Sequence, residues 1–247
     1  MDNKQDLENF KSAVLSTAKA IARKSIDPKE LEKIAKINVP KILSIENKDE
    51  ILEARALADS EALRMRYNDE NISKQNEPRG TISKSLFKIA EKIRYEKIGS
   101  DEYQGIQNNL NNFYQKKIAN SDVHSQNFIA DAFEAYLRKN IMNMPIDENK
   151  KQDFKRWDDL FNKKIFTKID NLTTSLNDQQ QYTNLVKSII EDLDINDQKN
   201  DPQNIENENG EDNNNENQNQ QQSLEEEQNQ QSKNQEFEME NIVPEIE

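Results

Sequence analysis

The chain has 247 residues and a formal net charge of −13, with four glycines, six prolines and no cysteine. Without cysteine, a disulfide framework and a thiolate metal site are both excluded. So few glycines and prolines argue against a turn-rich β-protein and favour helices.

The acidity belongs to one end of the chain. From Glu191 onward there are 18 acidic residues and 2 lysines, which leaves 29 acidic and 32 basic residues before it. A near-neutral body does not indicate nucleic-acid binding, which needs a clustered basic face. No apolar run approaches the ~20 residues of a membrane-spanning helix, and the first residues, MDNKQDLENF, are too polar for a signal peptide. We expect a cytoplasmic protein with no nucleic-acid or membrane partner.

Apolar residues recur at the 3.6-residue spacing of amphipathic helices in seven segments. These predicted helices cover residues 6–24, 51–66, 82–99, 103–118, 128–141, 154–169 and 182–193. Residues 30–46 are expected to form an extended or edge-strand crossing instead, because they contain β-branched residues around Pro40. A short helix over LEKIAKI, residues 31–37, is the alternative for the first part of this segment. The prediction is an all-α, multi-helix bundle-like body over residues 1–195.

Short sequence patterns indicate where individual helices begin and end. A polar loop is predicted over residues 71–80, and Thr81 or Ser83 is expected to cap the helix that follows it. Gly99 stands where a left-handed residue would end that helix. From residue 196 to the end, the Asn, Gln and Glu-rich sequence offers little to bury, which predicts a long disordered acidic tail over residues 196–247.

The helices at 51–66 and 82–99 hold the densest mixture of apolar and paired charged residues. Asp59 lies on the packing face of the first helix among small residues, and a buried acid needs a partner. Arg55 is the local candidate partner and Arg94, in the second helix, the long-range one. The candidate packing or partner-docking residues are Arg55, Asp59, Arg66 and Arg94.

A search for catalytic patterns gives no catalytic, cofactor-binding or metal-ligating residue. His124 is the only histidine, which excludes HExxH and His-rich metal sites, and its neighbour Asp122 adds one further potential ligand. Neither common glycine-rich phosphate loop occurs. The acid pairs Asp158-Asp159 and Glu191-Asp192 are interpreted as solvated faces. The aromatic residues are interpreted as core; they are Phe154, Trp157, Phe161 and Phe166.

Two segments, ARALADSEALRMRYND (residues 54–69) and AEKIRYEKIGSDEYQGIQNNL (residues 90–110), resemble the N-terminal region of the CobT subunit of aerobic cobaltochelatase. Supporting similarity follows the same order in FKSAVLSTAKAIA, in RWDDLFNKKIFTKIDNL and in the acidic low-complexity linker. The resemblance covers residues 1–195 in sequence order. For the linker it is limited to the acidic, low-complexity composition. Family members continue into a von Willebrand A-type domain, which is absent from this sequence; a truncated or split form is one expectation.

The resemblance implies a non-catalytic subunit of an ATP-dependent cobaltochelatase in cobalamin biosynthesis. In such a complex a large catalytic subunit inserts cobalt into hydrogenobyrinic acid a,c-diamide, and the CobT subunit is the partner of an AAA+ ATPase subunit. The complex would use ATP, Mg and Co, with no cofactor bound by this chain. Two alternatives remain open from composition: a helical adaptor or scaffold with no link to cobalt, and a metallochaperone that collects cobalt with its acidic tail.

Overall fold

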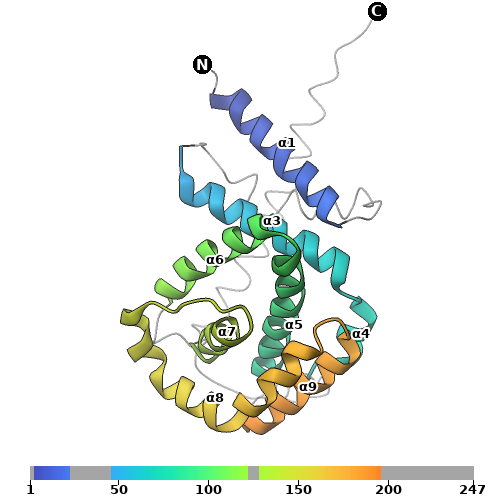
Figure 1. Cartoon of the computed structure of the whole chain (residues 1–247), viewed down its shortest axis with the longest axis vertical. Helices are drawn as coiled ribbons and strands as arrows, with labels where there is room; N and C mark the ends of the chain where they lie inside the picture. The colour runs from blue at the N-terminus through green and yellow to red at the C-terminus, as the bar shows by residue number, and fades with distance from the viewer. Residues whose placement is uncertain (1–2, 23–45, 122–127, 196–247) are drawn as a thin grey trace, which may run out of the picture. The chain divides into compact units, whose positions relative to one another are not determined.

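The computed structural model describes residues 3–22, 46–121 and 128–195 (Figure 1). All of them belong to one compact unit, residues 1–200, and the second unit, residues 201–247, lies outside the description. Within the described ranges there are helices and no strands, which confirms the all-α prediction. The helices are α1 (Asn3–Ala22), α3 (Lys48–Tyr67), α4 (Glu70–Asn76), α5 (Thr81–Glu102), α6 (Gln104–Ala119), α7 (Phe128–Ile141), α8 (Glu148–Thr174) and α9 (Gln179–Leu193).

Two sequence predictions fall outside these ranges. The extended crossing predicted over residues 30–46 lies outside the described residues apart from Glu46, which is in a turn. The predicted disordered tail, residues 196–247, lies outside them entirely. For the part of the chain that is described, no helix is both long and apolar enough to cross a membrane.

Helix α5 is the element around which most of the others pack. It contacts α3, α6, α7 and α9, while α1 packs on α3, and α8 packs on α7 and α9. In Figure 1, α7 is seen nearly end-on between α5 and α8. The apolar stripe of α5 enters the core through Leu86, Ala90 and Ile93, as the helical spacing predicts. A charged side chain on α5 that points inward must therefore find its partners within the core, on α5 itself or on a neighbouring helix.

Gly99 lies inside α5, so the prediction that it ends the helix is wrong. The helix continues to Glu102, and among the described residues no glycine has a positive φ. A Cβ atom on Gly99 would lie 2.2 Å from Cδ2 of Leu63, a fully buried residue of α3. Glycine is needed here because the two helices approach closely at Leu63.

The segment between α3 and α5 also differs from the prediction. Residues 71–80 were expected to form a loop, but most of them belong to the short helix α4. Asp69 caps α4, because its side chain accepts hydrogen bonds from the backbone N–H groups of Asn71 and Ile72. The residue at the N-cap of α5 is Gly80, not Thr81 or Ser83. A carboxylate cap therefore allows the polar segment to form a helical turn.

The aromatic residues of α8 divide between core and surface. Phe154 and Phe161 are buried, and Trp157 is half-buried with its ring centre 6.1 Å from that of Phe161. Phe166 is 58% exposed, so the prediction that it belongs to the core is wrong. Phe161 and Ile165 occupy the buried stripe, and Phe166 lies one position past it, about 100° further around the helix.

Candidate partner-docking site

The four candidate residues are placed in two separate recesses. Arg66 and Arg94 line a recess of about 740 Å³ formed by the end of α3, α4 and the start of α9. Arg55 and Asp59 line a second recess, of about 220 Å³, between α1, α3 and α6. Arg94 therefore does not join Arg55 and Asp59 in a single network.

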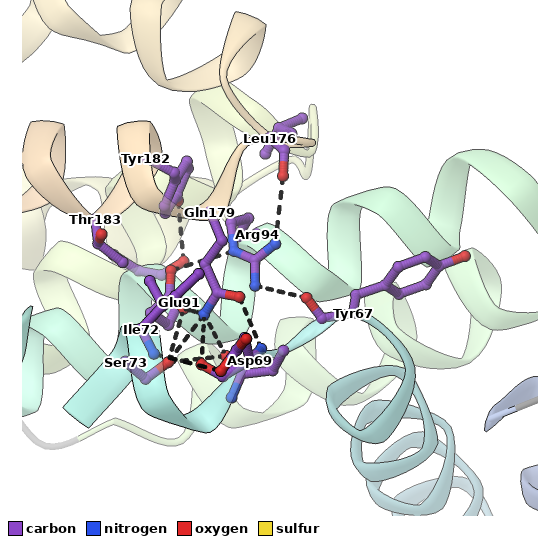
Figure 2. Close-up of polar contacts among 12 residues, drawn as sticks. Tyr67, Asp69, Ile72, Ser73, Glu91, Arg94, Leu176, Gln179, Tyr182 and Thr183 are labelled. Carbon is purple, nitrogen blue, oxygen red and sulfur yellow. Dashed lines mark hydrogen bonds and ion pairs between the residues drawn. The ribbon is translucent and has the colours of Figure 1, made fainter. Parts of the chain in front are cut away.

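Arg94 is a buried side chain that connects three parts of the fold. Its Nε donates to Oε1 of Glu91 at 3.2 Å, and its two terminal nitrogens donate to the backbone carbonyls of Tyr67 at 2.9 Å and Leu176 at 3.3 Å (Figure 2). Tyr67 is the last residue of α3, and Leu176 lies in the turn between α8 and α9. The guanidinium therefore satisfies two helix-end carbonyls while it pairs with a carboxylate.

Gln179 completes the polar cluster on the opposite side of Glu91. Its Nε2 donates to Oε2 of Glu91 at 2.7 Å and contacts Oγ of Ser73 at 3.0 Å (Figure 2). Its Oε1 accepts a hydrogen bond from the backbone N–H of Asp69 at 2.8 Å. One side chain at the start of α9 is thus bonded to both α4 and α5. We call Glu91, Arg94 and Gln179 the α5–α9 cluster.

Arg66 joins the ends of three helices at the rim of the larger recess. Its terminal nitrogens donate to Oε2 of Glu102 and to the hydroxyl of Tyr103, both at 2.9 Å, and to the carbonyl of Ile21 in α1 at 3.4 Å. The hydroxyl of the neighbouring Tyr67 donates to Glu102 at 2.6 Å. Burial and this hydrogen bond raise the pKa of the Tyr67 phenol. Arg66 therefore acts as a packing residue in this chain.

Asp59 is buried but forms no ion pair with Arg94, whose carboxylate partner is Glu91. Its Oδ2 accepts a hydrogen bond of 2.9 Å from the side-chain amide of Asn109 in α6. Burial raises the pKa of the Asp59 carboxyl, and the Asn109 hydrogen bond and the nearby Arg55 charge oppose this rise only in part. Asp59 is thus a partly compensated acid at the floor of a small recess.

Arg55 is the exposed member of the four candidates. Its guanidinium carbon lies 5.2 Å from the centre of the Phe10 ring of α1, a cation–π distance. Phe10, Arg55, Asp59 and Asn109 all line the recess between α1, α3 and α6. An exposed cation, a half-buried aromatic ring and a buried carboxylate therefore line one recess.

A second ionic cluster in the core was missed by the sequence analysis. Arg138 of α7 donates to Oε2 of Glu96 in α5 at 2.8 Å and to Oε1 of Glu134 at 2.9 Å. The other oxygen of Glu96 accepts from Oγ of Ser60 in α3 at 2.5 Å and from the hydroxyl of Tyr114 in α6 at 3.1 Å. Four helices therefore meet at one charged group. We call Glu96, Glu134 and Arg138 the core ionic cluster.

The charges of the core ionic cluster are compensated almost completely. Burial disfavours the charged form of Glu134, but Arg138 and Lys117 outweigh it and lower the pKa of this carboxyl to about 2. Lys117 Nζ lies 2.6 Å from Oε2 of Glu134, and the Arg138 guanidinium carbon lies 3.2 Å from the centre of the Tyr114 ring. One sequence signal was available: Glu134 and Arg138 are spaced i, i+4 on a helix that is otherwise mostly apolar.

The two acid pairs lie on helices within the described part of the chain, and each has a lysine partner. Asp158 pairs with Lys139 at 2.9 Å and Asp192 with Lys168 at 2.6 Å, both near the surface. Over the described residues, no three metal-ligating side chains come together as a metal site would require. His124 and Asp122 lie in the segment 122–127, outside the described residues.

A family model that matches most of the chain shows the family to which the chain belongs. The model of the family described as cobalamin biosynthesis protein CobT matches residues 4–243. The chain belongs to the CobT family. The matched range includes both segments that carry the sequence resemblance, residues 54–69 and 90–110, and confirms it. Membership supports a role in cobalamin biosynthesis. No solved structure matches this CobT chain.

Proposed function

We propose that this CobT chain is a non-catalytic subunit of an ATP-dependent cobaltochelatase, in which it is the partner of an AAA+ ATPase subunit. A separate large subunit would insert cobalt into hydrogenobyrinic acid a,c-diamide. The observation that carries this proposal is membership of the CobT family over residues 4–243. The complex would use ATP and Mg, and cobalt would be its substrate. The role of this chain would be to bind the other protein subunits.

The arrangement of charges supports a division between packing and docking residues. Arg66 and Arg94 hydrogen-bond to helix ends and carboxylates of their own fold, so their donors are occupied. Arg55 is exposed, and beside it Asp59 and the Phe10 ring line an open recess. Arginine and aromatic side chains are enriched at protein interfaces and among the residues that contribute most to binding. We therefore assign partner docking to Arg55 and Asp59, and packing to Arg66 and Arg94.

Co-purification of the full chain with the AAA+ subunit encoded in the same genome tests this proposal. The two proteins should co-elute, and Arg55→Glu should weaken binding by at least about tenfold, or about 1.4 kcal/mol. Lys163→Glu is the matched control, because Lys163 is an exposed cation on α8, outside the recess. Failure of the wild-type chain to bind the ATPase subunit, with both proteins folded, would contradict the proposal.

A further inference from the structure

A third recess lies between α3, α4 and α5, next to the α5–α9 cluster. Its volume is about 340 Å³, and Phe87, Glu91 and Tyr95 of α5 and Ser73 of α4 contribute to its wall. A volume near the lower end of the range for ligand pockets is suited to one ring-sized group. Figure 2 shows two residues of this wall, Ser73 and Glu91, held within the polar cluster. The wall is therefore fixed by bonds within the fold.

Two aromatic rings provide the apolar part of this recess. Phe87 is 2% exposed and Tyr95 is 7% exposed, so both side chains belong to the core and only a small part of each borders the recess. Lys88 and Lys92 also line it. Lysine side chains cover apolar surface with their methylene groups while the ammonium group stays in water. The recess thus has an apolar part, and the cations Arg64, Lys74 and Lys88 line it together with the carboxylate of Glu77.

The cationic side chains around the recess differ in how closely acidic residues pair with them. Arg64 is occupied by Glu61 at 2.6 Å and Glu70 at 2.9 Å. Lys74 and Lys88 are held only by long contacts, 3.5 Å to Glu70 and 3.4 Å to Glu77, and their side chains are 75% and 63% exposed. Exposed ion pairs of this kind contribute little to stability. These two lysines are therefore free to turn toward a carboxylate in the recess.

We propose that this recess binds an aromatic side chain flanked by carboxylates, presented by another protein. The ring packs against the apolar part of the wall, to which Phe87 and Tyr95 contribute, and the flanking carboxylates pair with Lys74 and Lys88. The inference rests on the proposed function in taking the ligand to be a protein partner. The ligand chemistry itself follows from the size of the recess, the apolar part of its wall and its exposed lysines. It gives the chain a docking point separate from the recess that contains Arg55.

Titration of the isotope-labelled full chain with capped tripeptides, followed by NMR, tests this ligand chemistry. The peptide with the order Glu, Phe, Glu should cause saturable shifts in the amide signals of residues around Phe87 and Tyr95. The peptide with both acids replaced by lysine and the peptide with alanine in place of the ring should each bind at least about tenfold more weakly. Equal binding of the acidic and basic peptides, or shifts confined to other surfaces, would overturn the proposal.

A charge-reversal variant supplies the second readout. Lys74→Glu combined with Lys88→Glu should weaken binding of the acidic peptide at least about tenfold, while Lys163→Glu on α8 should leave it unchanged. Unchanged binding by the double variant, with an unchanged thermal melt, would also overturn the proposal. Peptide binding by a chain that does not bind the AAA+ subunit would contradict the proposed function and leave this inference standing.

Discussion

Arg138 and Glu96 form an ion pair of 2.8 Å between α7 and α5, and the structure leaves both side chains fully buried. Removing two charges from water is costly, and their attraction compensates only when further hydrogen bonds satisfy the remaining groups. Here Ser60 and Tyr114 bond to the glutamate, and Glu134 bonds to the arginine. The pair therefore fixes how four helices meet, and its loss should be felt across the fold.

Arg138→Leu should lower the free energy of unfolding by about 3–5 kcal/mol, because it leaves Glu96 as a buried and uncompensated charge. The control is Lys139→Leu, one position further along α7. Lys139 pairs with Asp158 at the surface, and such a pair contributes at most about 1 kcal/mol. Denaturant unfolding of both variants measures the difference. Equal effects would contradict the compensation assigned to the core ionic cluster.

Glu134→Gln should destabilise the protein in a pH-dependent way. The folded chain lowers the pKa of Glu134 to about 2, against about 4.3 in an unfolded chain. Its ionised form therefore stabilises the fold above the unfolded pKa, and this contribution is lost as the pH falls toward 2. Unfolding curves of the wild type and the variant should differ most at neutral pH and converge under acid. A constant difference across this range would contradict the assignment.

Gly99→Ala should destabilise the fold because its new Cβ would collide with Leu63 at 2.2 Å. Overpacking a core costs about 1–3 kcal/mol, which should exceed the ~1 kcal/mol gained by replacing a glycine inside a helix. Gly105→Ala is the control, since a Cβ atom built there meets nothing within 4 Å apart from its chain neighbours and its own helix backbone. That variant should be neutral or stabilising in thermal melts. A stable Gly99→Ala protein would show that α3 and α5 can separate at little cost.

Asp59→Asn separates the cost of burying Asp59 from its role in docking. Burial raises the pKa of Asp59 above its unfolded value, so the favourable protonated form is present below the unfolded pKa and is lost as the pH rises through the folded one. At neutral pH the variant should therefore be at least as stable as the wild type, and any advantage should shrink in acid. Thermal melts at several pH values measure this, and a large loss of stability at neutral pH would contradict it.

The same variant should weaken binding to the AAA+ subunit, because the amide keeps the shape of the side chain and removes its charge. Co-purification under the conditions used for Arg55→Glu measures this effect. Unchanged binding would assign Asp59 to packing alone.

Apart from α4, the described helices followed in type and order from the sequence, because an amphipathic stripe of 3.6-residue period is a local property. The role of Gly99 did not follow, because a glycine after an apolar stripe is as typical of a helix end as of a close helix contact. Only the position of Leu63, 36 residues earlier, distinguishes the two. The exposure of Phe166 likewise depended on which side of α8 faces the core.

The candidate site was predicted only in part, for a related reason. Arg55 and Asp59 share one recess because they are one helical turn apart on α3. The partner of Arg94 was one turn back on its own helix, at Glu91, and not on α3. The Glu96–Arg138 pair joins residues 42 positions apart. Such a pairing depends on how α5 and α7 pack, which the periodicity of either helix alone does not reveal.

Cobalt insertion by the reconstituted complex tests the central claim most directly. The large catalytic subunit and the AAA+ subunit from the same genome are mixed with ATP, Mg²⁺, Co²⁺ and hydrogenobyrinic acid a,c-diamide, with and without the full chain, and corrin absorbance is followed. The proposal predicts insertion only when the chain is present, and none by the chain alone. Equal rates with and without the chain, or insertion by the chain alone, would contradict a non-catalytic subunit role.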